Sequence, residues 1–185
     1  MKDFMKYILG YIKCKINNIK CIGKCYIGSG KIINNGNFIL GNKTIIRPST
    51  DIYIHTRESN LRIGNNTEIG NHSTISSYAN IIIGNGVLTG PHVFIADHNH
   101  KYTDPNTPIY EQGIEIVHNA SLQIDDGTWI GTNVVIVGNV HVGKNCVIGA
   151  NSVVTKDIPD FSIAVGCPVK IIKKYNFNKQ CWERI

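Results

Sequence analysis

The stretch from Ile124 to Val154, IDDGTWIGTNVVIVGNVHVGKNCVIGANSVV, decides the fold. An aliphatic residue returns at every sixth position of this stretch: Ile124, Ile130, Ile136, Val142, Ile148 and Val154. A period of six fits neither an amphipathic helix, whose period is 3.6, nor a strand that alternates with a period of two. It fits short strands joined by tight turns and repeated as a parallel β-helix, with each aliphatic side chain pointing into the coil.

The same rhythm extends toward the N-terminus and is then interrupted. It begins near Cys21, is expected to loosen around residues 47–59, where Pro48 indicates a turn, and resumes at Ile63. Residues 99–121, NHKYTDPNTPIYEQGIEIVHNAS, have no such period and hold two prolines and many polar groups. They predict a long loop after Asn99, and a long loop that leaves a rigid scaffold is a usual place for a site.

Both ends of the chain differ from the repeat. Residues 1–20 predict a capping segment with a short amphipathic helix, residues 21–165 the β-helix domain with loop 99–121, and residues 166–185 a basic C-terminal segment. A short helix is expected from Val169 to Tyr175, where it would cover the open end of the coil. Contact of residues 1–20 with the inner membrane face is the alternative to a purely capping role.

Charge is distributed unevenly. Residues 1–31 carry seven Lys and one Asp, residues 169–185 carry five Lys or Arg and one Glu, and the middle is net acidic within a total of +6. Basic ends favour an anionic ligand or membrane surface near them. Nucleic acid is not expected as a partner, because no basic stripe interleaved with aromatic residues follows the repeat. With no signal peptide or membrane-spanning segment predicted, a cytoplasmic protein is expected.

The chain holds six cysteines, of which Cys21 and Cys25 have the spacing of a metal knuckle. No second Cys or His pair follows at a matching distance. Reduced thiols with structural roles are therefore expected, with Cys146 as a small hydrophobic residue inside the coil.

The densest polar cluster is Asp97-His98-Asn99-His100, at the point where the repeat gives way to the loop. A neutral imidazole can take a proton from a hydroxyl near neutral pH. Two other interpretations stay open: a metal site built from His98, His100 and His92, and histidines that only hold the root of the loop by hydrogen bonds.

A second cluster is basic and follows the last coils: Lys156, Lys170, Lys173 and Lys174, with the hydroxyl of Thr155. Such lysines either keep a surface solvated or supply charges for the phosphates of a nucleotide-like ligand. Trp129, unusual among small repeat residues, is either a core anchor or the wall of a ligand groove.

The hexads together with DHNH (97–100) and the tail GCPVKIIKKYNFNKQCWERI (166–185) resemble the hexapeptide-repeat acyltransferases. Within that family the pattern is most similar to the O-acetyltransferases of bacterial O-antigen and capsular polysaccharides, and the similarity covers residues 60–185 best. The resemblance implies a left-handed β-helix, a homotrimer with active sites between subunits, acetyl-CoA as donor, a carbohydrate acceptor and no metal.

The resemblance also implies roles for individual residues. His100 falls at the general base when the repeats are laid side by side without gaps, and His98 is the fallback. Positions that would contact the donor are Trp129, Gly131, Thr132, Gly149, Ala150, Thr155, Lys156, Lys170 and Lys173. Independently of the resemblance, Asp97, Tyr78 and His72 are candidates for shaping the acceptor pocket together with the loop at 101–120, and Asp97 or a loop carbonyl is expected to orient the imidazole.

The expected reaction is acetyl transfer from acetyl-CoA to a sugar hydroxyl of a surface polysaccharide or its precursor, by direct transfer in a ternary complex. An N-acetyltransferase of an amino sugar is the first alternative, since it uses the same fold and donor. From another class, a metal-dependent hydratase like the γ-carbonic anhydrases would need three histidines around zinc.

Overall fold

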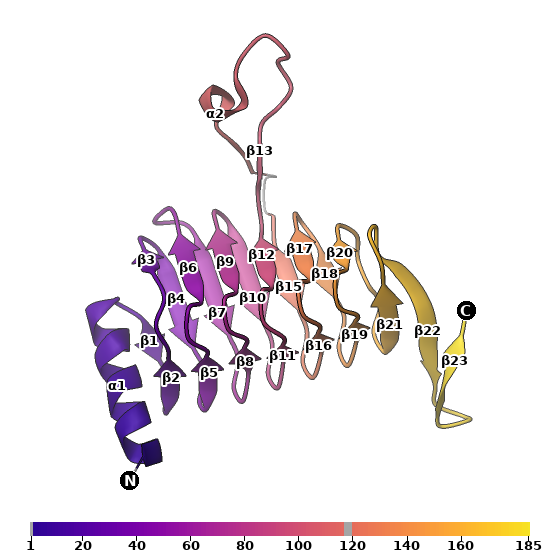
Figure 1. Ribbon diagram of the computed structural model, residues 1–185, viewed down its shortest axis with the longest axis horizontal. Coiled ribbons are helices and arrows are strands. Elements are labelled where there is room, and N and C mark those ends of the chain that lie inside the picture. Colours follow the sequence, from indigo (N-terminus) through magenta and orange to yellow (C-terminus); the bar gives the residue numbers. More distant parts are fainter. Residues whose placement is uncertain (1, 117–119) are drawn as a thin grey trace.

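The computed structural model of the protein describes residues 2–116 and 120–185, and these residues wind into a parallel β-helix with three long sheets (Figure 1). Sheet A contains β1 (Lys20–Cys21), β4 (Asn37–Leu40), β7 (Asn60–Ile63), β10 (Asn80–Ile83), β15 (Leu122–Ile124) and β18 (His141–Val142). Sheet C contains β3 (Ile32–Asn34), β6 (Asp51–Ile54), β9 (Thr74–Ser77), β12 (Phe94–Ala96), β17 (Val135–Val137) and β20 (Val153–Val154).

Sheet B is the longest sheet because the C-terminal strands extend it. Its parallel part contains β2 (Cys25–Ile27), β5 (Thr44–Ile46), β8 (Glu68–Ile69), β11 (Leu88–Thr89), β16 (Trp129–Ile130), β19 (Val147–Ile148) and β21 (Ser162–Val165). The strands β22 (Lys170–Asn176) and β23 (Cys181–Arg184) then add to it in antiparallel fashion.

The period-six residues form the core, which confirms the predicted β-helix. Ile124, Ile130, Ile136, Val142, Ile148 and Val154 are all fully buried. Identical positions stack on successive coils, as in the ladder of Ile95, Ile136 and Val154 in sheet C. Most strands therefore bury at least one aliphatic side chain, and those of sheet A often bury two, as with Leu61 and Ile63. The backbone hydrogen bonds run between coils.

The six-residue period breaks between residues 47 and 59 and Pro48 lies in a turn, as predicted, but the coil does not loosen there. Strand β6 lies in this segment, and it pairs in parallel with β3 on one side and with β9 on the other. The extra residues are accommodated in the turn between β6 and β7, where Thr56 and Ser59 bond to each other. The coil is longer at this point without losing its register.

The predicted C-terminal helix is also wrong, because residues 170–176 form strand β22. Exposure alternates along the strand, with Lys170, Ile172 and Lys174 more exposed than the residues between them. The last parallel strand, β21, has an open edge, and β22 satisfies its backbone groups as an antiparallel partner. A strand hairpin thus closes the end of the coil that a helix was expected to cover.

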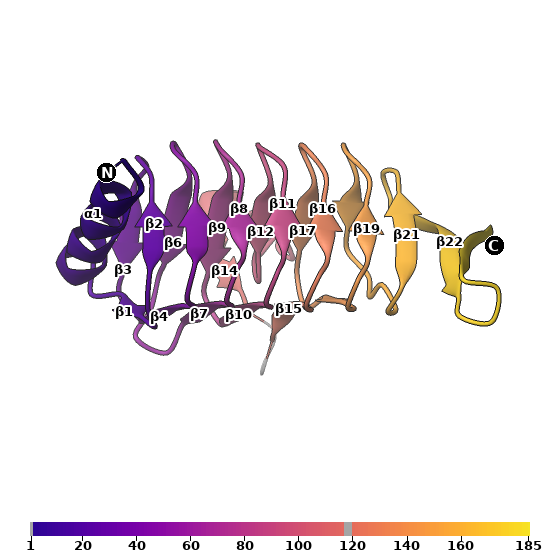
Figure 2. The same ribbon diagram turned by 90° about the horizontal axis from the view of Figure 1, so that it is seen from below.

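The other end of the coil carries the helix α1 (Lys2–Ile16), which lies against β2 (Figures 1 and 2). Gly10 and Cys14 are the buried residues of its described part, whereas the larger apolar side chains of Ile8, Leu9 and Ile12 are exposed. The helix approaches so closely that a Cβ at Gly10 would collide with the carbonyl oxygen of Cys25. Only a face of small residues fits there, so the apolar face is turned outward.

The predicted loop leaves the coil after β12 and stands clear of it (Figure 1). Its root is a short antiparallel pair of β13 (Asn99–His100) and β14 (Ile114–Glu115), and its outer part carries α2 (Ile109–Gln112). Residues 117–119, near the return of the loop to β15, lie outside the described residues. Within the described residues, no helix has the length and apolar character that a membrane span requires.

Candidate functional site

The site is organised by the buried carboxylate of Asp97, which follows β12 at the corner between sheets C and A. One carboxylate oxygen accepts hydrogen bonds from the Tyr78 amide at 2.8 Å and from His98 Nδ1 at 3.2 Å. The other accepts from the Ser77 hydroxyl at 2.7 Å and from the Ala79 amide at 2.9 Å. Four donors from two neighbouring coils therefore converge on one acid that is only 2% exposed.

These donors keep Asp97 ionised. Burial by itself would raise the pKa of the carboxyl, but the hydrogen bonds from His98, from Ser77 and from the two backbone amides outweigh it, so the pKa lies below its ordinary value. An ionised carboxylate only accepts hydrogen bonds, so Nδ1 of His98 must carry the proton in this pair. Nε2 of the neutral ring then has a free lone pair, as a general base requires.

Aromatic rings from the two preceding coils, those of Tyr78 and His55, hold the imidazole of His98 in place. The Tyr78 ring contacts it edge-on at 4.5 Å. His55 stacks on the face of Tyr78 at 4.0 Å with 10° between the ring planes, and its ring centroid lies 5.9 Å from that of His98. The side chain of His98 is 12% exposed, so it is largely enclosed yet reachable. Burial first, and the electrostatic influence of the nearby His98 second, lower the pKa of His55.

Sequence reasoning missed His55. Its ring bonds to the Ser76 hydroxyl at 3.0 Å and completes the stack, although 43 residues separate it from His98. The signal lies in the strand register, which pairs Ile54 with Ser77 and Ser76 with Ala96, so that the residues after these strands must be neighbours. That register becomes visible only when the coils are stacked.

His100 has a different environment from His98. It is exposed on β13, where its backbone pairs with Ile114, and the described structure gives its ring no hydrogen-bond partner. His72 is not part of the site either: it precedes β9, at the opposite end of that strand from Tyr78, and stacks on His92 at 5.1 Å. Of the three residues expected to shape an acceptor pocket, the structure brings together Asp97 and Tyr78.

The three histidines of the metal hypothesis do not converge. His92 lies before β12 and His98 after it, at the two ends of one strand. Within residues 2–116 and 120–185, the one group of three potential ligands for a metal ion consists of cysteines far from this corner. The interpretation as a zinc hydratase is therefore not supported.

Most of the residues that are expected to contact the acetyl donor lie on the last coils of sheet B and at the corner between sheets B and C. Register places Trp129, Val147, Ile163 and Lys173 in one ladder along sheet B. Trp129 is 52% exposed, which rules out its role as a core anchor and leaves a wall on the surface.

A second ladder lies at the corner beside the first. It runs through Gly131, Gly149, Val165 and Lys170, as the register of the preceding residues requires. Thr132 and Ala150 follow the two glycines, and the amide of the next residue, Asn151, donates to the Thr132 carbonyl at 2.9 Å. A Cβ at Gly131 would lie 2.6 Å from the amide nitrogen of Ala150, so only glycine permits this close stacking of coils.

Thr155 and Lys156 lie on the other edge of sheet C. They follow β20, and the ladder of Ile95, Ile136 and Val154 relates their position to that of Asp97. Two strand spacings separate the levels of Asp97 and Lys156 along the coil, which is about 10 Å. Thr155 and Lys156 are exposed, so they can contact a ligand that runs along this edge.

Comparison with known proteins agrees with this architecture. Residues 122–156 match the sequence family described as bacterial transferase hexapeptide (six repeats). A maltose O-acetyltransferase from Clostridium difficile 630 is 32% identical, with a TM-score of 0.61 over 72% of this chain and 67% of that one. WbbJ of Escherichia coli K12, whose name provisionally assigns it an O-acetyl transferase role in lipopolysaccharide biosynthesis, is 37% identical over 56% of this chain and 55% of its own.

The fold alone is shared with more distant structures. AntD from Bacillus cereus, an N-acyltransferase, superimposes with a TM-score of 0.74 over 91% of this chain and 90% of its own at 18% identity. The protein belongs to the hexapeptide-repeat transferases. The chain spans about half the length of the first curated relatives that it matches, from 41% to 55% for three of them.

Proposed function

We propose that the protein transfers an acetyl group from acetyl-CoA to a hydroxyl group of a carbohydrate, with His98 as the general base. The observation that carries the proposal is the pair formed by the buried, ionised Asp97 and the enclosed imidazole of His98. Relatives named galactoside and maltose O-acetyltransferases support the reaction type.

In this mechanism Nε2 of His98 accepts the proton of the sugar hydroxyl as its oxygen attacks the thioester carbonyl. The new C–O bond forms, the C–S bond breaks, and the proton passes from the imidazolium to the departing thiolate of CoA. Asp97 keeps the ring in the tautomer with a free Nε2 and stabilises the imidazolium through Nδ1–H. General-base assistance of this kind contributes roughly 10² to 10⁴ in rate.

His98 replaces His100 as the favoured base for a physical reason. A base needs a fixed position and a defined tautomer, and the described structure provides both for His98 through Asp97 and Tyr78. His100 is exposed at the root of the loop and lacks such partners there. His100 is therefore the second candidate for the base. If His98 is the base, His100 would contact the acceptor instead.

Acetyl-CoA as donor is supported by relatives and by the residues that would meet it. Related structures are described with coenzyme A or acetyl-CoA bound, AntD and a hexapeptide-repeat acetyltransferase from Vibrio cholerae among them. Here Lys156, Lys170 and Lys173 present ammonium groups for phosphates, and the half-exposed Trp129 offers a flat apolar wall. Lysine supplies the charge without the paired hydrogen bonds of arginine.

The spacing of these groups supports a trimer with sites shared between subunits. The amide of Gly138 donates to the carbonyl of Ala96, so Gly138 marks the corner that carries Asp97. The strip of residues expected to contact the acetyl donor, which includes Thr132, lies at the other corner of sheet C. The five residue steps from 133 to 138 span about 16 Å. Within one chain the base and this strip lie on opposite corners, and a neighbouring chain would bring the strip to the base.

The projecting loop supports the same assembly. Its residues Tyr102, Ile109 and Tyr110 are exposed, and α2 buries none of its side chains in the single chain. Apolar side chains held away from their own coil fit a contact with a second copy. The loop would then lie over the site of the neighbouring subunit and take part in binding the acceptor.

A bacterial surface polysaccharide or its precursor is the proposed acceptor, supported by the similarity to WbbJ. The N-acylation of an amino sugar is the second candidate, because AntD, whose structure was determined with dTDP-4-amino-4,6-dideoxyglucose, shares the fold over most of the chain. An ester product is cleaved by mild alkali and an amide is not, so the product separates the two.

The cytoplasmic side of a membrane is the proposed location. Ile8, Leu9 and Ile12 of α1 are 40–51% exposed, and residues 1–31 carry a net charge of +6. An apolar helix face within a basic segment fits an anionic bilayer. We expect the protein to sediment with phosphatidylglycerol vesicles but not with phosphatidylcholine vesicles. Loss of that difference in an Ile8→Asp/Ile12→Asp variant would support the proposed location.

The test of the proposed function uses labelled acetyl-CoA with a panel of galactosides, maltose, bacterial glycans and amino sugars. We expect an alkali-labile acetylated sugar. His98→Ala is expected to lower kcat by about 10² to 10⁴, and His100→Ala to change it less than about tenfold. The reverse order of the two variants would move the base to His100, and no transfer to any acceptor would overturn the proposal.

A further inference from the structure

We infer that Cys14, Cys21 and Cys25 form a binding site for one thiophilic d¹⁰ cation, Zn²⁺ or Cu⁺, that joins helix α1 to the first coil. The three sulfur atoms lie within 4.8 Å of one another. The Sγ atom of Cys25 is 2.9 Å from that of Cys21 and 3.3 Å from that of Cys14. This is the one such cluster of three ligand residues in the part of the chain that the structure describes.

The three thiols come from three different elements, so the fold has assembled them. Cys14 lies in the last turn of α1, Cys21 ends β1 and Cys25 begins β2. In the sequence, Cys21 and Cys25 lack a second pair of ligands, but the close approach of Gly10 to the Cys25 carbonyl sets the helix where it supplies the third thiol. Cys14 of the helix thus adds a third ligand to the pair formed by Cys21 and Cys25.

The geometry is close to that of a bound cation. Zinc binds thiolate sulfur at about 2.3 Å, and tetrahedral angles then separate the sulfurs by roughly 3.8 Å. The two separations from Cys25 Sγ, 2.9 Å and 3.3 Å, are shorter than this value, and the third separation is at most 4.8 Å. Side-chain shifts of under about 1 Å would turn three hydrogen-bonded thiols into three ligands.

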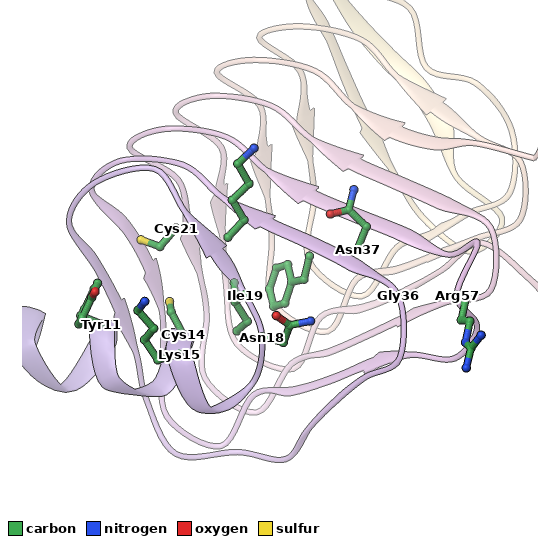
Figure 3. A pocket seen from close by; sticks show the side chains of 11 residues that line it. Tyr11, Cys14, Lys15, Asn18, Ile19, Cys21, Gly36, Asn37 and Arg57 are labelled. Atoms are coloured by element: carbon green, nitrogen blue, oxygen red, sulfur yellow. The ribbon is translucent and has the colours of Figure 1, made fainter.

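A cavity gives the cluster access to solvent. It has a volume of about 550 Å³, and Cys14 and Cys21 lie in its wall beside Tyr11 and Lys15 (Figure 3). A cation can enter by this route, and water can take the fourth position that zinc requires. Cu⁺, a softer ion, needs no more than the three thiolates.

The electrostatic surroundings suit a site of net negative charge. Three thiolates with Zn²⁺ carry −1 and with Cu⁺ carry −2, and the same cavity is lined by Lys15, Lys20 and Arg57. Lys15 follows Cys14 and Lys20 precedes Cys21 in the chain, so their charges would offset the excess negative charge. Carboxylates, which would favour harder ions, are not among the described residues that line the cavity.

A reactive cysteine is a poorer interpretation of the same cluster. Burial raises the pKa of Cys21 to about 12, and a hydrogen bond with Cys14 followed by burial raises the pKa of Cys25 as well. Nucleophilic and redox-active cysteines have lowered pKa values. Binding of a metal ion would exchange the protons of these thiols for the cation.

The site is separate from the site proposed for acetyl transfer, so its test does not depend on activity. Tag-free protein, purified under reducing conditions, is analysed for zinc and copper by mass spectrometry. The metal-free protein is then titrated with Zn²⁺ against a chromophoric chelator and, without oxygen, with Cu⁺ against bicinchoninate. We expect one cation per chain, and the two titrations identify which ion binds more tightly at the free concentrations of a cell.

Serine variants assign the ligands. Each of Cys14→Ser, Cys21→Ser and Cys25→Ser is expected to weaken binding at least about 10-fold to 100-fold. The matched control is Cys167→Ser/Cys181→Ser, which removes the two exposed thiols and should leave affinity unchanged. Binding should also raise the thermal unfolding midpoint of the unaltered protein by about 5 °C or more, because the ion binds only the folded site.

One readout needs no substitution and stays valid if a variant fails to fold. Addition of Co²⁺ to the unaltered protein should produce the near-ultraviolet band of thiolate-to-cobalt charge transfer, and Zn²⁺ should abolish it. The proposal is overturned if this band is absent, if stoichiometric binding persists in the triple serine variant, or if protein kept under reducing conditions holds a disulfide within the cluster.

Discussion

Replacing Asp97 by asparagine tests the core of the proposed site. Both oxygens of the carboxylate accept two hydrogen bonds: one from Tyr78 N and His98 Nδ1, the other from Ser77 Oγ and Ala79 N. Asparagine offers a single carbonyl oxygen, so its NH₂ group must face one of these two pairs of donors. The Ser77 hydroxyl can turn and accept, and His98 can change tautomer, but a backbone amide can do neither.

Either orientation of the new side chain therefore leaves one buried amide without an acceptor, Ala79 N in one case and Tyr78 N in the other. An unpaired buried donor costs about 1–3 kcal/mol, and the remaining bonds also lose their charge assistance. The free energy of unfolding of Asp97→Asn should fall by roughly 3 kcal/mol in total.

The rate follows from the same choice of orientation. If His98 keeps its bond to the asparagine oxygen, its tautomer is retained, but the imidazolium loses a counter-charge. If the NH₂ group faces His98, Nε2 becomes protonated and cannot act as a base. We expect kcat to fall by at least about 10² in the first case and about 10⁴ in the second.

Urea unfolding followed by circular dichroism measures the first effect, and release of the CoA thiol measures the second. Asp126→Asn is the matched control, because Asp126 is exposed and accepts from the Asn85 amide at 2.6 Å on a different corner of the coil. It should change stability by less than about 1 kcal/mol and leave kcat unchanged. Asp97→Asn with stability within about 0.5 kcal/mol and an unaltered kcat would refute the reasoning.

Two further predictions concern pH and the N-terminal helix. The pKa of His55 is lowered in the folded state, first by burial and then by His98, so its contribution to stability is present above about pH 6.5 and is lost as the pH falls through that value toward the folded pKa. The urea midpoint should therefore decrease from pH 7 to pH 5.5, and less so in His55→Gln; equal decreases would contradict the assignment. Gly10→Ala should lower the thermal midpoint despite the higher helix propensity of alanine, because the new Cβ meets the Cys25 carbonyl; a higher midpoint would mean that α1 does not dock as described.

The fold was predictable wherever one side chain per strand had to be buried. Ile130, Ile136 and Ile148 follow the six-residue period and are all inside. The C-terminal segment was not predictable in this way, because Lys170–Tyr175 suits a helix or a strand about equally. The open edge of β21 decided between them, and that edge exists only after the coil has formed.

The site was predictable in composition but not in arrangement. Asp97 and His98 are adjacent, so the sequence placed an acid beside an imidazole. The choice of His98 over His100 depends on burial by Tyr78 and on the amides of the coil below, and no spacing reveals these. His55 could not be found because the length of the coils varies: Ile54 pairs with Ser77, 23 residues away, Ser76 with Ala96, 20 away, and Ile136 with Val154, 18 away.

The sequence alone therefore determined the β-helix, its inward residues, the position of the loop and the acid–imidazole pair, because each depends on neighbours along the chain or on a short period. The tertiary structure decided which histidine is held, which aromatic rings hold it and how Cys14 reaches Cys21 and Cys25. Those contacts join different coils or a helix to a coil. Their geometry depends on turn lengths and docking distances, which are fixed only when backbone hydrogen bonds and close packing act together.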